Sequence, residues 1–275
     1  KEKVREDQRG IVGSDSRTKI CLHESCYPYS TIGEFDSRTE KGGCTGTVIS
    51  PTAVLTAAHC HYFNGQWTDL DRFAPGRYRK YRRVSGKGKI KNPYGIWIAQ
   101  TRTIFNGWIT AQNLRNDFAI ITFSPTLYNG GDEDEEGDEE DDEEYYEGNL
   151  NIGDLVGYMG ISATTNDSYD LQFATVTGYS YDKPDGEMWT SGYCHGGFKK
   201  AYDDVITYHD CDGVKGHDGA ALLDLEYNLV YGINVADVPV GPEYPDQSFT
   251  NIGVIIHESN IGLINIAAGL QVNIH

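Results

Sequence analysis

Short apolar runs of four to eight residues, bounded by Gly, Asn, Asp and Pro, recur along most of this chain. Clear examples are Ala53–Ala57, Phe118–Phe123 and the two runs on either side of the turn at 226–228. Runs of this length predict β-strands, whereas the spacing typical of a helix is nearly absent until after Ser259. The pattern therefore predicts an all-β fold that ends in a short C-terminal helix.

Charge is unevenly distributed along the chain. It carries 41 acidic and 23 basic residues, but residues 132–147 hold 13 of the acids and no base. The net charge of −18 argues against nucleic acid or an anionic membrane as a partner. No apolar run is long enough to insert into a membrane, and the polar first ten residues are unlike a signal peptide. We expect a mature or trimmed form with no membrane insertion.

Six cysteines allow three disulfides, and Asn166-Asp167-Ser168 is an N-glycosylation motif. Disulfides form and persist in oxidising compartments, and N-glycans are added to secreted chains. We therefore predict a secreted, extracellular protein with a glycan on Asn166.

Two insertions are strongly charged. Residues 77–91 contain eight Lys and Arg, and residues 132–147 are almost entirely acidic. Segments of this composition do not enter a core, so we predict that both are solvated loops. The basic loop of one molecule is complementary to the acidic loop of the next, which suggests salt-sensitive self-association or binding of a protein partner.

The acidic insertion has part of the spacing of an EF-hand calcium loop. The residues at the ligand positions are Asp132, Asp134, Glu136 and Glu143. No helices flank this run, Glu136 stands where Asp or Asn is usual, and such spacing arises easily in an acidic segment. We expect no cofactor, and a diffuse, weak attraction of Ca²⁺ is the alternative.

A stretch near residue 50 resembles a known family. Gly42–Cys60 (GGCTGTVISPTAVLTAAHC) ends in a His directly before a Cys, with a second Cys sixteen residues upstream. It resembles the histidine segment of trypsin-like serine proteases, and Asn116–Ile121 is similar to their aspartate segment. The match is closest to the glutamyl endopeptidase branch and its animal secreted relatives. The resemblance implies that His59 is the general base and that Asp117 orients it.

The same resemblance implies a fold of two packed, antiparallel, six-stranded β-barrels with a short C-terminal helix. The expected segments are an N-terminal extension 1–12, a first barrel 13–128, an acidic linker 129–150, a second barrel 151–256 and a C-terminal helical segment 257–275. In this layout the expected disulfides are Cys44–Cys60, Cys194–Cys211 and, by elimination, Cys21–Cys26.

The resemblance fails at the serine nucleophile. The corresponding loop reads Gly216-His217-Asp218-Gly219, so Asp218 stands where the family has its serine. A carboxylate has no proton for His59 to remove at neutral pH and is a poor nucleophile toward an amide. Its charge also opposes an oxyanion bound by the backbone N–H groups of Gly216 and Asp218. Loss of a serine nucleophile lowers turnover by about 10⁶, so we predict no peptidase activity.

The specificity pocket also departs from the family pattern. Where the glutamyl endopeptidases have a threonine and a histidine that hold the substrate carboxylate, this chain has Gly213 and Asn234. We therefore expect acidic side chains to bind poorly. With no serine to activate, we expect His59 to form an ion pair with Asp218, in preference to a metal site made by the same residues.

Three functions remain open from the sequence. A secreted pseudoprotease that acts as a binding or assembly module is favoured by Asp218, the altered pocket and the charged insertions. The second is a residual hydrolase in which His59 and Asp117 act on a water molecule. The third is a calcium-binding, extracellular matrix-type protein that carries the acidic insertion on a protease scaffold.

Overall fold

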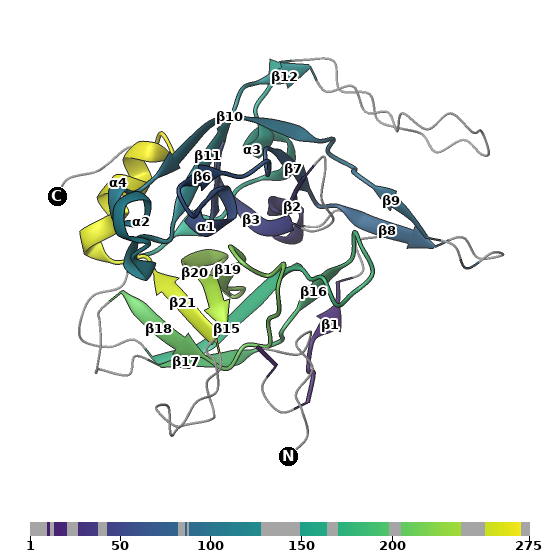
Figure 1. The fold of residues 1–275 in the computed structure, drawn as a ribbon. Helices are drawn as coiled ribbons and strands as arrows, with labels where there is room; N and C mark the ends of the chain where they lie inside the picture. The colour runs from purple at the N-terminus through teal and green to yellow at the C-terminus, as the bar shows by residue number, and fades with distance from the viewer. Residues whose placement is uncertain are drawn as a thin grey trace.

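Two β-barrels, stacked one on the other, make up the body of the protein (Figure 1). The structure is a computed structural model. It describes residues 10–11, 14–20, 27–37, 43–81, 86, 88–127, 149–163, 170–197, 205–237 and 251–270.

The first barrel is closed by six antiparallel strands. Their order is β10 (Trp97–Ile104), β11 (Ala119–Phe123), β4 (Ala53–Thr56), β3 (Gly43–Ser50), β2 (Ile32–Asp36) and β7 (Arg72–Pro75). Aromatic rings fill the interior, with centroid distances of 4.7 Å between Phe35 and Phe73 and 5.7 Å between Phe73 and Phe123. Gly33 and Gly46 make room for these rings, because a Cβ at these positions would lie 2.4 Å and 2.6 Å from a ring carbon.

The second barrel is part of a nine-stranded sheet. Its strands are β1 (Thr18–Lys19), β14 (Gly160–Ile161), β15 (Asp170–Tyr179), β16 (Met188–Thr190), β17 (Cys194–Gly197), β18 (Ile206–His209), β19 (Ala221–Asp224), β20 (Leu229–Asp237) and β21 (Asn251–Ile255). Six of them form a ring in which each pairs with the next: β15, β17, β18, β21, β20 and β19, which pairs back with β15. The predicted all-β, two-barrel fold is confirmed.

Short helices and the ribbon of β5 and β6 lie between or after the barrel strands. They are η2 (Tyr29–Thr31), α1 (Ala58–His61), β5 (Tyr62–Phe63), β6 (Gln66–Trp67), α2 (Asn106–Ala111), η3 (Leu114–Asn116), α3 (Ile152–Val156) and α4 (Glu258–Ala267). Helix α4 is the predicted C-terminal helix, and it lies beside the first barrel, where the Ser50 hydroxyl donates to the Ala268 carbonyl at 2.9 Å (Figure 1). None of the helices in the described ranges has the length and apolar character needed to cross a membrane.

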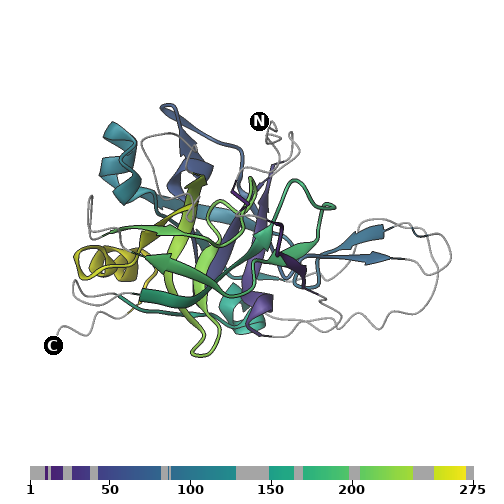
Figure 2. The same cartoon turned by 90° about the horizontal axis from the view of Figure 1, so that it is seen from below.

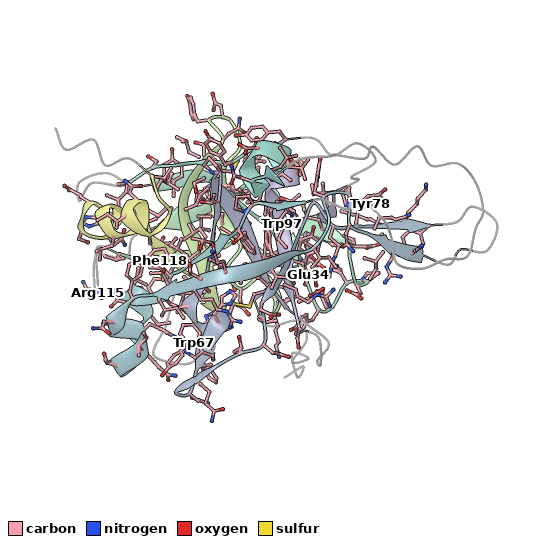
Figure 3. The ribbon with its side chains drawn as sticks, turned by 90° about the horizontal axis from the view of Figure 1, so that it is seen from above. Glu34, Trp67, Tyr78, Trp97, Arg115 and Phe118 are labelled. Atoms are coloured by element: carbon pink, nitrogen blue, oxygen red, sulfur yellow. A yellow bond between two sulfur atoms is a disulfide. The ribbon has the colours of Figure 1, made fainter. Side chains whose placement is uncertain are left out.

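The basic insertion forms a hairpin, which corrects our prediction of a solvated loop. Strand β8 (Tyr78–Tyr81) pairs with β9 (Gly88–Lys91), and the hairpin extends away from the barrels (Figure 2). At its base the buried Arg77 guanidinium donates to Glu34 at 2.9 Å and to Asp36 at 2.6 Å; Figure 3 labels Glu34 and the neighbouring Tyr78. This cation enters the protein because two carboxylates of β2 compensate its charge.

The hairpin also contacts the second barrel. The Tyr81 hydroxyl donates to Glu187 at 2.7 Å, and the Arg79 guanidinium donates to the Asp185 carbonyl at 2.6 Å. Both partners lie in the segment between β15 and β16. The hairpin therefore contacts both barrels at its base and also projects from them.

The acidic insertion begins and ends on a small ribbon in which β12 (Thr126–Leu127) pairs with β13 (Asn149–Leu150). Several predicted features lie outside the described residues: the acidic run with Asp132, Asp134, Glu136 and Glu143, the glycan acceptor Asn166, and Cys21 and Cys26. Strand β1 pairs with β16 of the second sheet, although the expected first-barrel range began at residue 13.

Replacing Arg77 with methionine should lower the free energy of unfolding by roughly 3–5 kcal/mol, because the Glu34 carboxylate would stay buried without its cation. Urea unfolding at neutral pH measures this change. Lys80→Met, at an exposed position in the same hairpin, is the matched control and should stay within about 0.5 kcal/mol of the natural chain. Equal losses in the two variants would contradict the buried ion pair.

Candidate active site

His59 lies on the one-turn helix α1, directly after β4. Strand β4 pairs with β11, and this register brings Asp117, two residues before β11, next to α1. The Asp117 carboxylate accepts two hydrogen bonds of 2.8 Å, one from the backbone N–H of His59 and one from Nδ1 of its ring. Asp117 is 1% exposed. The ring is therefore fixed, and its Nε2 points away from Asp117.

Asp218 approaches the same ring from the second barrel, in the loop before β19. Its Oδ2 lies 3.9 Å from Nε2 of His59, and the two side chains are 23% and 21% exposed. Burial alone would lower the pKa of His59, but the charge and hydrogen bond of Asp117, together with the nearby Asp218 carboxylate, raise this pKa to about 10. The structure thus brings the three predicted residues together where the barrels meet, with His59 as an imidazolium at neutral pH.

The loop that carries Asp218 needs glycine at two positions. Gly216 has φ +101° and Gly219 has φ +81°, in the left-handed region that favours glycine. A Cβ at Gly216 would lie 2.6 Å from the Tyr179 carbonyl oxygen, and one at Gly219 would lie 2.2 Å from the Thr56 hydroxyl. Within the described part of the chain, the backbone N–H groups of Gly216 and Asp218 make no hydrogen bond, so both remain available as donors.

Thr45, on β3, holds this loop against the first barrel. Its backbone N–H donates to the Asp218 carbonyl at 2.9 Å, and its hydroxyl donates to the Gly216 carbonyl at 2.8 Å. Its neighbour Cys44 is bonded to Cys60, which confirms the predicted disulfide beside His59. Sequence analysis missed Thr45, and its only signal was its place next to Cys44.

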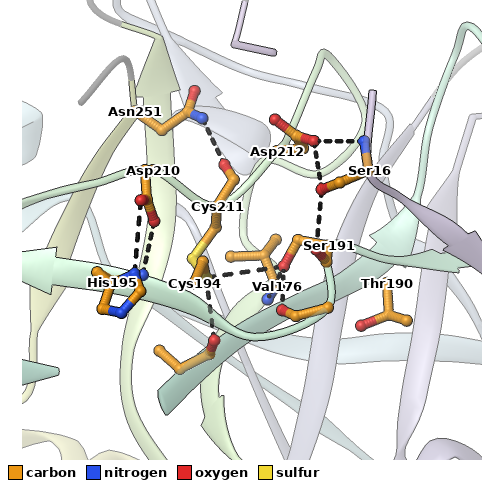
Figure 4. Close-up of a disulfide and its surroundings, with 12 residues drawn as sticks. Ser16, Val176, Thr190, Ser191, Cys194, His195, Asp210, Cys211, Asp212 and Asn251 are labelled. Atoms are coloured by element: carbon orange, nitrogen blue, oxygen red, sulfur yellow. Dashed lines mark hydrogen bonds and ion pairs between the residues drawn. A yellow bond between two sulfur atoms is a disulfide. The ribbon is translucent and has the colours of Figure 1, made fainter. Parts of the chain in front are cut away.

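The second predicted disulfide, Cys194–Cys211, is also confirmed. It joins β17 to the stretch that leads into Asp218 (Figure 4). The next residue, Asp212, accepts hydrogen bonds from the backbone N–H and the hydroxyl of Ser16 at 2.7 Å and 2.6 Å. Asn251 donates to the Cys211 carbonyl at 2.6 Å. The disulfide and Ser16 of the N-terminal segment therefore fix the stretch 211–212, which leads into the loop of Asp218.

These features agree with comparison to known proteins. The model of the trypsin family matches residues 21–235. The chain belongs to the trypsin family. Its sequence identity to the individual members below is 28% or less.

Two curated bacterial proteins are similar in sequence to this chain. The glutamyl endopeptidase of Bacillus licheniformis is 28% identical over 183 residues, covering 66% of this chain and 45% of that protein. The extracellular metalloprotease of Bacillus subtilis is 26% identical over 185 residues, covering 66% and 48%. This trypsin-family chain thus spans about half the length of the curated relatives it matches.

Solved structures show the same fold. A Glu endopeptidase in complex with MPD superposes with a TM-score of 0.66 and 23% identity over 94% of this chain and 99% of that one. The protease Anisep from Arthrobacter nicotinovorans has a TM-score of 0.60 and 17% identity over 88% and 97% of the two chains. At these identities the likeness establishes the trypsin fold alone.

The two predicted pocket positions of this trypsin-family chain are packed against His217. A Cβ at Gly213 would lie 3.7 Å from Nδ1 of His217 and 3.9 Å from the Asn234 amide nitrogen. That amide donates to the His217 carbonyl at 3.2 Å, and both residues are buried. His217, which sequence analysis noted only as part of the loop, is therefore the residue that connects the predicted pocket to the Asp218 position.

A buried cation that sequence analysis missed supports the other side of the loop. The Arg17 side chain is fully buried and donates to the Ser180 hydroxyl at 2.9 Å and to Asp182 at 3.1 Å. Between these partners, Tyr181 donates its backbone N–H to the Lys215 carbonyl at 3.0 Å, one residue before Gly216. Arg17 thus fixes the turn on which the loop rests.

Proposed function

We propose that this chain is a secreted, catalytically inactive member of the trypsin family that serves as a binding and assembly protein. One observation carries the proposal. A carboxylate, Asp218, faces Nε2 of His59 at 3.9 Å, at the position where the family's reaction needs a hydroxyl. Around it, Asp117 orients His59, and the N–H groups of Gly216 and Asp218 remain available as donors.

Three effects of this carboxylate act against peptide hydrolysis. It offers no proton to a base and would form a high-energy mixed anhydride if it attacked an amide. It helps to raise the pKa of His59 to about 10, so the ring holds a proton at neutral pH and does not act as a base. Its charge lies beside the N–H groups of Gly216 and Asp218, where it opposes a developing oxyanion.

Secretion is supported by the two disulfides, Cys44–Cys60 and Cys194–Cys211, because disulfides are rare in reducing compartments. The name of the Bacillus subtilis relative describes an extracellular protein. We propose the same location for this chain.

The test of inactivity is direct. The purified chain should show no hydrolysis of a broad peptide panel that depends on His59, and no labelling by a fluorophosphonate, which reacts covalently with activated serines. A His59→Ala variant is the control for contaminating proteases, since its background should equal that of the natural chain. Hydrolysis that disappears in His59→Ala would refute the proposal.

Assembly is the function that the charged insertions favour. The hairpin β8–β9 is a folded element that carries Arg79, Lys80, Lys89 and Lys91 on its two strands and projects from the barrels (Figure 2). The acidic insertion starts and ends at the β12–β13 ribbon, which is a separate element from the β8–β9 hairpin. Docking of one molecule's hairpin on the next molecule's acidic insertion joins two different surfaces, which propagates into rings or filaments.

Sedimentation measures this association. We expect oligomers at about 10 mM salt that dissociate as ionic strength rises to about 0.5 M, because the attraction between exposed charges is screened. Added Ca²⁺ should also weaken the oligomers if it binds the acidic insertion. A monomer under every condition would rule out assembly while leaving the inactivity of the site untouched.

A further inference from the structure

We infer that His59 and Asp218 form a binding site for a divalent transition-metal ion of the Zn²⁺ class. The distance between their facing atoms is the first reason. At 3.9 Å, Nε2 and Oδ2 are further apart than a direct hydrogen bond, which spans about 2.7–3.2 Å. Two ligands about 2.0–2.2 Å from one tetrahedral zinc ion lie roughly 3.3–3.6 Å apart. The observed separation exceeds that range by only a few tenths of an ångström.

The way in which His59 is held is the second reason. Both Asp117 oxygens are occupied, one by the backbone N–H of His59 and one by Nδ1, so Asp117 orients the ring and leaves Nε2 toward Asp218. Metal-binding histidines are held in this manner by a carboxylate on the ring nitrogen that does not bind the metal. Nε2 has two neighbours: the disulfide sulfur of Cys60 at 3.7 Å and the Asp218 carboxylate at 3.9 Å. With Asp117, two carboxylates therefore surround one imidazole, and this arrangement attracts a cation.

Access is the third reason. The side chains of His59 and Asp218 are 21% and 23% exposed, so water can fill the remaining coordination positions, as it does in open zinc sites. The sulfur atoms of Cys44 and Cys60 lie in the same cluster, but they are joined in a disulfide and do not serve as thiolate ligands. An imidazole with a carboxylate suits Zn²⁺ or Cu²⁺, whereas Ca²⁺ prefers oxygen ligands alone.

This proposal revises our expectation that these residues form an ion pair in preference to a metal site. The ion pair is the state without metal, and zinc must displace the proton of Nε2 to bind. Metal ligands bind in their deprotonated forms, so binding should release a proton and tighten as the pH rises. The inference does not rest on the inactivity or the assembly proposed above.

Calorimetric titration of the full chain with ZnCl₂ tests the site. Excess Ca²⁺ is present throughout to occupy the acidic insertion. We expect one zinc ion per natural chain at this site, and an affinity that falls roughly 10–100-fold or more in Asp218→Asn and in His59→Gln. The control is Asp210→Asn, which removes the carboxylate from a similar but exposed pair, His195–Asp210 at 3.6 Å, and should leave the affinity unchanged.

A second measurement needs no substitution. Paramagnetic Co²⁺, which takes the place of zinc in such sites, should shift and broaden the ring signals of His59 in the NMR spectrum before those of His195. Absence of zinc binding by the natural chain, equal affinity in all three variants, or a Co²⁺ effect confined to His195 would each overturn the proposal. None of these results bears on peptide hydrolysis, so this inference and the proposed function fail separately.

Discussion

An Asp218→Ser variant should react with the fluorophosphonate that leaves the natural chain unlabelled, and should hydrolyse activated esters. The rest of the site is already in place: Asp117 holds His59 at 2.8 Å, and the N–H groups of Gly216 and the residue at 218 are available. The substitution also removes one of the two carboxylates that raise the pKa of His59, so the ring becomes a base closer to neutral pH. The gain in turnover has an upper limit of about 10⁶-fold.

Two control variants separate the gain of a hydroxyl from the loss of a charge and test the need for His59. Asp218→Ala removes the same charge without supplying a hydroxyl, so it should stay unlabelled. Asp218→Ser combined with His59→Ala should also be inert, because the serine then has no base. A folded Asp218→Ser variant that does not react would contradict our conclusion that only the hydroxyl is missing from the arrangement of His59, Asp117 and the N–H donors.

Stability should fall steeply in mild acid because three histidines are fully buried in the described chain. Burial lowers the pKa of His61 to about 3 and those of His209 and His217 to about 4, from an ordinary value of 6.5. The charge of Arg17 also lowers the pKa of His217. As the pH drops below about 6.5, the unfolded chain binds protons that the folded chain does not, so stability present at neutral pH is lost down to about pH 4.

Each of these histidines contributes about 1.4 kcal/mol per pH unit in that window, so the three together give a slope of about 4 kcal/mol per unit. Urea unfolding at pH 7, 6 and 5 measures it. His209→Gln should reduce the slope by about one third. His195→Gln is the control, since His195 is two-thirds exposed and its removal should leave the slope unchanged. Equal stability at pH 7 and pH 5 would contradict the burial of all three.

The sequence was sufficient for the parts of the site that follow a continuous motif. His59 and Cys60 are adjacent, and Cys44 lies in the same strand pair, so one stretch of sequence carried the disulfide and the ring together. Asp117 could be placed because its segment has its own pattern before an apolar strand. The loop of Asp218 was located by its glycines, whose backbone angles no other residue adopts readily.

The basic insertion shows why other parts could not be predicted. Its composition is that of a solvated loop, and Arg77 is buried only because Glu34 and Asp36 lie opposite it. Those carboxylates are about forty positions away in the chain and meet Arg77 through the register of β2 with β7. Thr45 and Arg17 were missed for a related reason: Thr45 acts on backbone carbonyls, which every residue has, so no sequence pattern marks its partners.

The ribbon of β12 and β13 has a consequence for experiments on this protein. It places Leu127 opposite Asn149, so the two ends of the segment 128–148 lie side by side and the segment has no distance to bridge. The entropy of closing such a loop grows slowly, by about 0.6 kcal/mol for each doubling of its length. Residues 128–148 can therefore be replaced as a unit while the β12–β13 ribbon is kept. A short linker, an affinity tag or a fluorescent domain inserted there should leave both barrels folded.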